Sequence, residues 1–170
     1  EGIYVRMTAK AASEAEAAAL LDAEDAELRK VLGDLVFAVD DDTMESTVLG
    51  LCEARGWTLG VGESLTGGFI GARLANVPGA SRVFRGAVAS YATEVKRSVL
   101  GVTAPLVVTG EAAKEMALGA CRALGADVGI SVTGVAGPDE MEGQPVGSVW
   151  YGIAIPGHEP EAIHAQLQIG

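Results

Sequence analysis

The amino-acid sequence predicts an α/β protein in which helices cover both faces of a layered sheet, preceded by a small β-α-β segment. Three observations support this fold class. Short runs rich in Val and Ile alternate with longer amphipathic runs, glycines close most of the amphipathic runs, and the 170-residue chain is 49% hydrophobic. That apolar content is enough to form a substantial core.

The first 44 residues are expected to form a small layer of their own. Its elements are a strand over 3–11, a helix over 13–33 and a strand over 34–40. Ser13 is a favourable N-cap and Gly33 a favourable helix terminator, and both flanking runs have strand-forming residues. We therefore expect two domains, a partial β-α-β segment over 1–44 and a main domain over 45–170.

The main domain is expected to repeat helices and strands. In order, the expected elements are helix 43–55, strand 57–62, helix 66–75, strand 86–91, helix 93–100, helix 109–124, strand 127–132 and strand 146–155. Pro78, Gly101 and Gly125 follow three of these helices, as expected where helices end. Such alternation is typical of a sheet with helices on both faces.

Charge and hydropathy exclude several classes of function. The net charge is −11, and residues 1–45 hold four basic against twelve acidic side chains, so neither part offers a basic face for nucleic acid. The long uncharged run over 143–157 contains Pro145 and Pro156 and is too short for a membrane span. The N-terminus lacks the apolar region of a signal peptide. Cys52 and Cys121 form no metal-binding or disulfide pattern, so we expect no metal site and a cytoplasmic location.

Ser64 is the first candidate for chemistry. It follows a short apolar run and precedes Thr66, Gly67 and Gly68, which predicts a turn from a strand into a helix. Reactive groups in open α/β sheets are usually found at such turns. Backbone amides at the start of a helix are unpaired, so these three residues could stabilise an oxyanion or bind a phosphate, although a glycine pair can also serve packing alone.

A nucleophilic serine needs a base, and the sequence favours a lysine over a histidine. The histidines, His158 and His164, both lie in the polar tail, which disfavours a Ser-His-Asp arrangement. Lys96 is expected in the first turn of a helix capped by Thr93, with Arg97 beside it, and both features disfavour the charged amine. A solvated surface lysine remains the alternative interpretation.

A second glycine-rich segment joins the two last expected strands over 134–145. It is longer than a hairpin loop, and Thr133, Gly134 and Gly137 could bring backbone close to a ligand. Its acidic residues are expected to be solvated loop charges and not metal ligands; they are Asp139, Glu140 and Glu142.

Four separated motifs together resemble one family, the C-terminal domain of the competence/damage-inducible protein CinA. In order along the chain they are GESLTGG over 62–68, YATEVK over 91–96, SVTGVAGPD over 131–139 and QPVGSVW over 144–150. The resemblance covers about residues 45 to 157. The acidic segment before it is similar to part of the KH-like middle segment of full-length CinA proteins.

The resemblance implies a serine amidase with a Ser-Lys dyad that acts in NAD salvage. Ser64 would be the nucleophile, Lys96 the general base and Tyr91 an assisting hydroxyl. The implied substrate-binding residues are Thr66, Gly67, Gly68, Thr133, Gly134 and Gly137. The implied reaction converts nicotinamide mononucleotide, a pyridine nucleotide, to nicotinic acid mononucleotide and ammonia without metal or organic cofactor. The family also implies a homo-oligomer.

The sequence departs from the family pattern in two places. Residues 139–144 replace a stretch that usually carries a glycine pair and a lysine, which removes a positive charge that could hold the phosphate. The chain also ends at Gly170, where the family continues into a last helix. These departures keep a second interpretation open, a regulatory or assembly module that binds a nucleotide without turnover.

Overall fold

The computed structural model describes residues 2–168, and the chain divides into two compact units, Glu1–Met44 and Glu45–Gly170. The larger unit contains a five-stranded sheet in the order β2-β1-β3-β4-β5. Its strands are β1 (Leu59–Glu63), β2 (Phe84–Ala89), β3 (Val128–Gly134), β4 (Ser148–Ala154) and β5 (Glu161–Gln166). β1 pairs in parallel with β2 and β3, whereas β3, β4 and β5 pair antiparallel. Four of these strands overlap the expected ones. β5 was not expected, because its residues were assigned to a polar tail.

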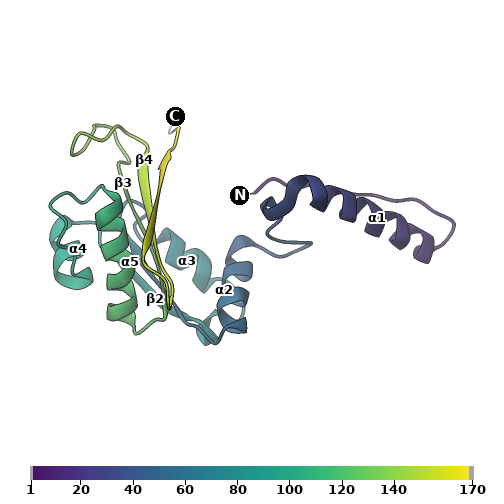
Figure 1. The fold of residues 1–170 in the computed structure, drawn as a ribbon, viewed down its shortest axis with the longest axis horizontal. Helices are drawn as coiled ribbons and strands as arrows, with labels where there is room; N and C mark the ends of the chain where they lie inside the picture. The colour runs from purple at the N-terminus through teal and green to yellow at the C-terminus, as the bar shows by residue number, and fades with distance from the viewer. Residues whose placement is uncertain (1, 169–170) are drawn as a thin grey trace. The chain divides into compact units, whose positions relative to one another are not determined.

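Helices cover both faces of this sheet, as the sequence predicted (Figure 1). They are α2 (Met44–Ala54), α3 (Phe69–Ala75), α4 (Thr93–Leu100) and α5 (Gly110–Leu124), with a short 3₁₀ helix at Ala80–Arg82. Leu49, Leu59 and Leu74 belong to the core between the sheet and α2 and α3. Leu100 and Met116 belong to the core under α4 and α5. The mixed α/β fold class is therefore confirmed.

The face under α5 is lined by glycine backbone. Gly129 of β3 and Gly152 of β4 lie so close to α5 that an added Cβ would overlap the carbonyl oxygens of Ala117 and Ala113. Gly62 of β1 faces the same helix, where its Cβ would lie 3.2 Å from the carbonyl oxygen of Met116. Small residues here let the helix approach the sheet closely.

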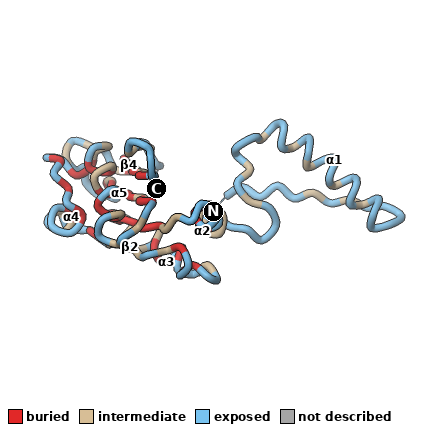
Figure 2. Tube along the Cα trace, turned by 60° about the horizontal axis from the view of Figure 1, so that its bottom comes forward, coloured by how far each residue is buried: buried red, intermediate tan, exposed pale blue. Residues whose placement is uncertain are grey.

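The smaller unit contains α1 (Glu14–Leu32), which ends as the sequence predicted. The Ser13 side chain accepts a hydrogen bond from the Glu16 amide, and Gly33 follows the last helical residue. The two expected strands were wrong: residues 3–11 form no strand, and the second stretch contains the 3₁₀ helix Gly33–Leu35. No residue from 2 to 44 is buried (Figure 2). An alternating pattern forms a stable strand only when one face is covered, and here Ile3 is 95% exposed.

Within residues 2–168, no helix has the length and apolar character that crossing a membrane requires.

Candidate active site

The predicted site residues follow the carboxyl ends of three neighbouring parallel strands. Ser64 follows β1, Tyr91 comes shortly after β2, and Thr133 and Gly134 end β3. β1 lies between the other two strands. The chain continues from β1 to β2 on one side and later forms β3 on the other side. Ligands of open α/β sheets bind at such a reversal of strand order. The topology therefore gathers three separated motifs at one edge.

Ser64 continues β1 by one residue. Its amide donates a hydrogen bond to the carbonyl of Val132 at 3.0 Å, so the parallel ladder extends past the last residue of the strand. Side chains alternate along a strand; Leu59 and Val61 face the core under α2 and α3, so the Ser64 side chain points to the α4 and α5 face. Ser64 is buried, and its hydroxyl donates to no other described residue.

Lys96 is buried as the fourth residue of α4. Its amine donates a 2.9 Å hydrogen bond to the Tyr91 carbonyl, at the end of the strand next to Ser64. Burial lowers the pKa of the Lys96 amine, while the carboxylates of Glu142 and Glu94 partly oppose that change. The solvated surface lysine is thus excluded.

The two members of the expected dyad make no direct hydrogen bond: Ser64 follows β1, and the Lys96 amine reaches from α4 to the Tyr91 carbonyl shortly after β2. Ser90, the residue before Tyr91, donates both its amide and its hydroxyl to the carbonyl of Glu63, at 2.7 and 3.0 Å. Glu63 immediately precedes Ser64. Among the described residues, the Lys96 amine has the Tyr91 carbonyl as its hydrogen-bond partner and not the Ser64 hydroxyl. Catalytic hydrogen bonds often tighten only when substrate is bound.

Tyr91 contributes its carbonyl to this arrangement. Its side chain is 68% exposed, and its hydroxyl has no hydrogen-bond partner among residues 2–168. The structure therefore leaves the expected role of this hydroxyl without a contact.

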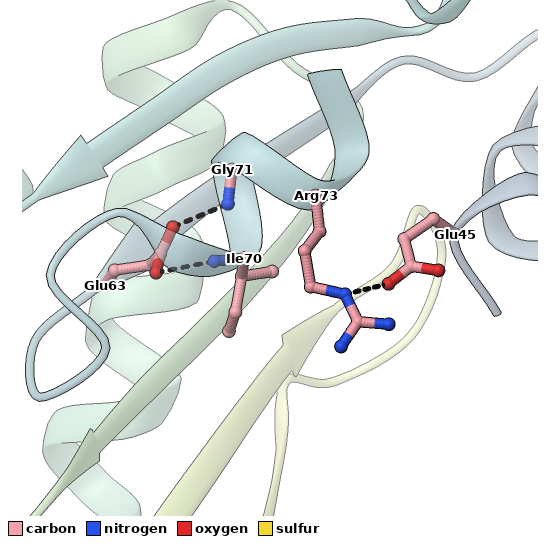
Figure 3. Close-up of polar contacts among 5 residues, drawn as sticks. All are labelled: Glu45, Glu63, Ile70, Gly71 and Arg73. Carbon is pink, nitrogen blue, oxygen red and sulfur yellow. Dashed lines mark hydrogen bonds and ion pairs between the residues drawn. The ribbon is translucent and has the colours of Figure 1, made fainter. Parts of the chain in front are cut away.

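Glu63 is a residue that sequence reasoning missed. It is fully buried, and its carboxylate accepts hydrogen bonds from the Thr66 hydroxyl at 2.6 Å and from the amides of Gly68, Ile70 and Gly71 at 3.1, 3.0 and 2.8 Å. Figure 3 shows the carboxylate at the amides of Ile70 and Gly71. An acid directly before a turn serine, at the end of an apolar run, was the available signal. Its four donors fix the path of the chain after β1.

The turn itself differs from the expected helix start, because α3 begins only at Phe69. Gly67 and Gly68 have φ values of 62° and 105° and belong to a turn. Their amides are not free, since Gly67 donates to the Ser64 carbonyl and Gly68 to Glu63. The expectation of unpaired amides at these two glycines was therefore wrong. The amides of Leu65 and Thr66 have no partner among the described residues.

Thr133 and Gly134 end β3, on the side of β1 opposite β2, and Gly137 follows in the loop after β3. Thr133 is buried, and its hydroxyl donates to the Val107 carbonyl at 2.7 Å. Gly134 lies against β4 so closely that an added Cβ would approach the Ser148 carbonyl oxygen at 2.5 Å. Gly137 has a φ of 89° and is exposed. The hydroxyl of Thr133 is thus committed to a structural bond.

Glu142 corrects another expectation. Asp139 and Glu140 are exposed, but Glu142 is half-buried. One of its carboxylate oxygens accepts hydrogen bonds from the amides of Val107 and Val108 at 2.8 and 2.9 Å. No group of His, Cys, Asp and Glu side chains suitable for a metal ion occurs within residues 2–168.

Comparison with known proteins gives a consistent picture. Residues 41–169 match the model of the CinA C-terminal domain. A CinA-like protein of Frankia casuarinae is 46% identical over 157 residues, which cover 89% of this chain and 36% of that protein. The chain thus spans well under half the length of this curated relative.

Solved structures of related proteins resemble this chain as well. The competence damage-inducible protein A of Klebsiella pneumoniae is 32% identical, with a TM-score of 0.68 over 73% of this chain and 80% of that one. A competence-damaged protein superfamily member of Escherichia coli is 28% identical, with a TM-score of 0.68 over 78% of this chain and 82% of the other. None of these comparisons identifies a KH-like segment at the front of the chain.

Proposed function

The chain belongs to the CinA C-terminal domain family, and from that premise we propose that it is an amidohydrolase of nicotinamide mononucleotide. The products would be nicotinic acid mononucleotide and ammonia. The proposal depends most on one observation, a buried lysine on α4 whose pKa is lowered and whose amine binds the Tyr91 carbonyl, shortly after the strand that neighbours β1. A neutral amine in that position can accept the proton of a serine hydroxyl.

The first half-reaction would acylate Ser64. The Lys96 amine takes the hydroxyl proton while the Ser64 oxygen attacks the carboxamide carbon. The resulting tetrahedral oxyanion could be stabilised by the amides of Leu65 and Thr66, which have no partner among the described residues. When the carbon–nitrogen bond breaks, Lys96 returns the proton to the leaving nitrogen, and ammonia departs.

The second half-reaction would release the product. Lys96 takes a proton from water, the hydroxide carbon–oxygen bond forms at the acyl carbon, and the Ser64–acyl bond breaks. The proton returns to the Ser64 oxygen, and the released carboxylic acid ionises in solution. Every step uses proton transfer and acyl transfer, and none requires a metal or an organic cofactor.

Measurement of ammonia released from nicotinamide mononucleotide tests this function. Ser64→Ala and Lys96→Met should each reduce kcat by about a hundredfold or more, the range of a lost nucleophile or general base. Lys114→Met is the matched control, since it removes a lysine of α5 that makes no hydrogen bond to a described residue, and it should retain activity. Equal ammonia release by all four proteins would exclude the mechanism.

A nucleotide-binding module without turnover is the second candidate. Two observations favour it. The Lys96 amine, which is the proposed base, donates a hydrogen bond to the Tyr91 carbonyl and not to Ser64. Gln144 also stands in the stretch where the family usually has a lysine. Calorimetric binding of nicotinamide mononucleotide without ammonia release would support this candidate. We also propose a cytoplasmic homo-oligomer, and light scattering after size-exclusion chromatography would measure its mass.

A further inference from the structure

Glu142 lies in a tight turn whose backbone conformation is energetically unfavourable for most residues other than glycine. Met141 and Gln144 form a small antiparallel bridge with hydrogen bonds in both directions, at 3.1 and 2.9 Å. Glu142 and Gly143 between them have φ values of 55° and 74°. Two residues with positive φ make a type I′ turn, in which Asn, Asp and Gly are the favoured first residues. A glutamate persists there only if its side chain makes compensating contacts.

The compensating contacts lie on the connection between α4 and α5. One Glu142 oxygen accepts the amides of Val107 and Val108, and both valines are almost fully buried. The Val107 carbonyl accepts the Thr133 hydroxyl. The connection is therefore bound on one side by β3 and on the other by the loop that follows β3. A charged acceptor with two amide donors is stronger than a neutral one.

The charge of the same carboxylate also raises the pKa of the Lys96 amine. It stabilises the protonated amine, and so does Glu94 from α4 itself. Other charged groups near this helix have partners elsewhere. Arg97 donates to the Ala104 and Pro105 carbonyls, Glu115 of α5 accepts from Thr103 and Ala104, Arg122 donates to the Leu100 carbonyl, and Glu63 is bound to the turn before α3. The remaining charged residues of α5 are Glu111 and Lys114.

From these contacts we propose that Glu142 is a positioning residue: it anchors the loop after β3 to the α4–α5 connection, and its negative charge acts on the amine of Lys96. The inference deepens the proposed function, since it assigns a partner to the proposed general base. Glu142 would keep the loop in place over the strand ends. Its charge would also stabilise the ammonium that forms when Lys96 takes the Ser64 proton, until that proton passes to the leaving nitrogen.

The test needs no substrate, so its outcome is independent of the ammonia assay. The protein has four lysines, which makes ¹³C labelling of the lysine ε-carbons practical, and Lys96→Met identifies the Lys96 signal. Glu142→Gln keeps an acceptor oxygen and removes the charge, so the Lys96 titration midpoint should move to lower pH. Glu140→Gln removes an exposed charge from the same loop and should leave the midpoint unchanged.

The anchoring role is measured by hydrogen exchange. Glu142→Gly keeps the positive φ and removes both hydrogen bonds, so the amides of Val107 and Val108 should exchange about tenfold faster or more. Glu142→Gln retains the acceptor and should protect them nearly as well as the native side chain. An unchanged Lys96 midpoint in Glu142→Gln, or unchanged protection of these amides in Glu142→Gly, would overturn the proposal.

Discussion

At the scale of single residues, Lys96 is the group whose chemistry depends most on its surroundings. Burial lowers its pKa, because the charged amine loses hydration that the single bond to the Tyr91 carbonyl only partly replaces. The neutral form is therefore available at lower pH than for a solvated lysine. This is the state that a general base requires.

The pH dependence of activity follows from that shift. The protonated amine cannot accept a proton, so kcat/KM should rise as pH increases through the lowered pKa of Lys96 and level off above it. The rise should end below the pH at which a solvated lysine titrates, about 10.4. A pH profile of ammonia release measures this. A rate that falls over the same interval would contradict the role of Lys96 as a base.

The same residue should reduce stability. Since the pKa is lower in the folded state than in the unfolded state, unfolding takes up a proton between those two pH values, and the free energy of unfolding rises with pH there. Lys96→Met should therefore raise Tm at pH 7, and the gain should shrink as pH increases through that interval. Thermal melts at several pH values provide the measurement. A lower Tm for this variant at every pH would show that burial of the amine is not costly.

Residue chemistry could be predicted from the sequence only where it depends on local order. The positions of Ser64 after a strand and of Lys96 near a helix start follow from neighbouring residues. The contact between Glu142 and Val107 joins positions 35 apart in the chain, and no local pattern indicates it. For the same reason the free amides of the turn were assigned to the glycines, although Glu63 binds one of them.

At the scale of elements, the turn between β1 and α3 depends on Glu63. A side chain without an acceptor would leave the Thr66 hydroxyl and three amides unpaired in a partly buried place. Glu63→Ala should lower the free energy of unfolding by about 3 kcal/mol or more. Denaturant unfolding measures the change.

A matched variant controls for the loss of an acidic side chain. Glu53→Gln breaks an exposed ion pair with Arg82 and should have little effect on stability. Equal stability of Glu63→Ala and Glu53→Gln would contradict the structural role of Glu63.

The close packing of α5 on the sheet gives a second prediction for elements. Gly152→Ala would place a methyl group against the Ala113 carbonyl and the Ser131 hydroxyl, and it should destabilise the protein by about 1 to 3 kcal/mol. Gly50→Ala is the control, because Gly50 lies inside α2 with nothing within 4 Å of the added methyl group. It should stabilise by about 0.5 to 1 kcal/mol. Urea unfolding of both variants tests whether steric contact or backbone entropy decides the sign of the change in the free energy of unfolding.

Elements were predictable where their amphipathic pattern meets a covered surface. α1, α2 and α5 were expected within one or two residues of their observed limits. The prediction of strands before and after α1 was wrong. No described residue of that unit is buried, so the alternating apolar residues have no core to pack against. β5 was missed for the opposite reason. It pairs along its length with β4, although its own residues are mostly exposed.

At the scale of the whole molecule, the two units differ in how they are stabilised. The unit Glu45–Gly170 contains both hydrophobic cores, whereas no described residue from 2 to 44 is buried. A protein that begins at residue 43 should therefore have the same Tm as the full chain within about 2 °C, since it loses almost no burial. Differential scanning calorimetry compares the two. A large drop in Tm would show that the first unit supports the second.

Because side chains alternate along a strand, Glu63 at the end of β1 and the residue after it point to opposite faces of the sheet. Glu63 extends toward α3, and the side chain of Ser64 points to the other face, toward α4 and α5. Deleting a single amino acid within this strand would exchange the faces to which these two side chains point. The carboxylate would then point toward α4 and α5, and the alcohol would be buried beneath α3. Whether β1 has an odd or an even number of residues therefore decides which of these two neighbouring side chains faces α4 and α5.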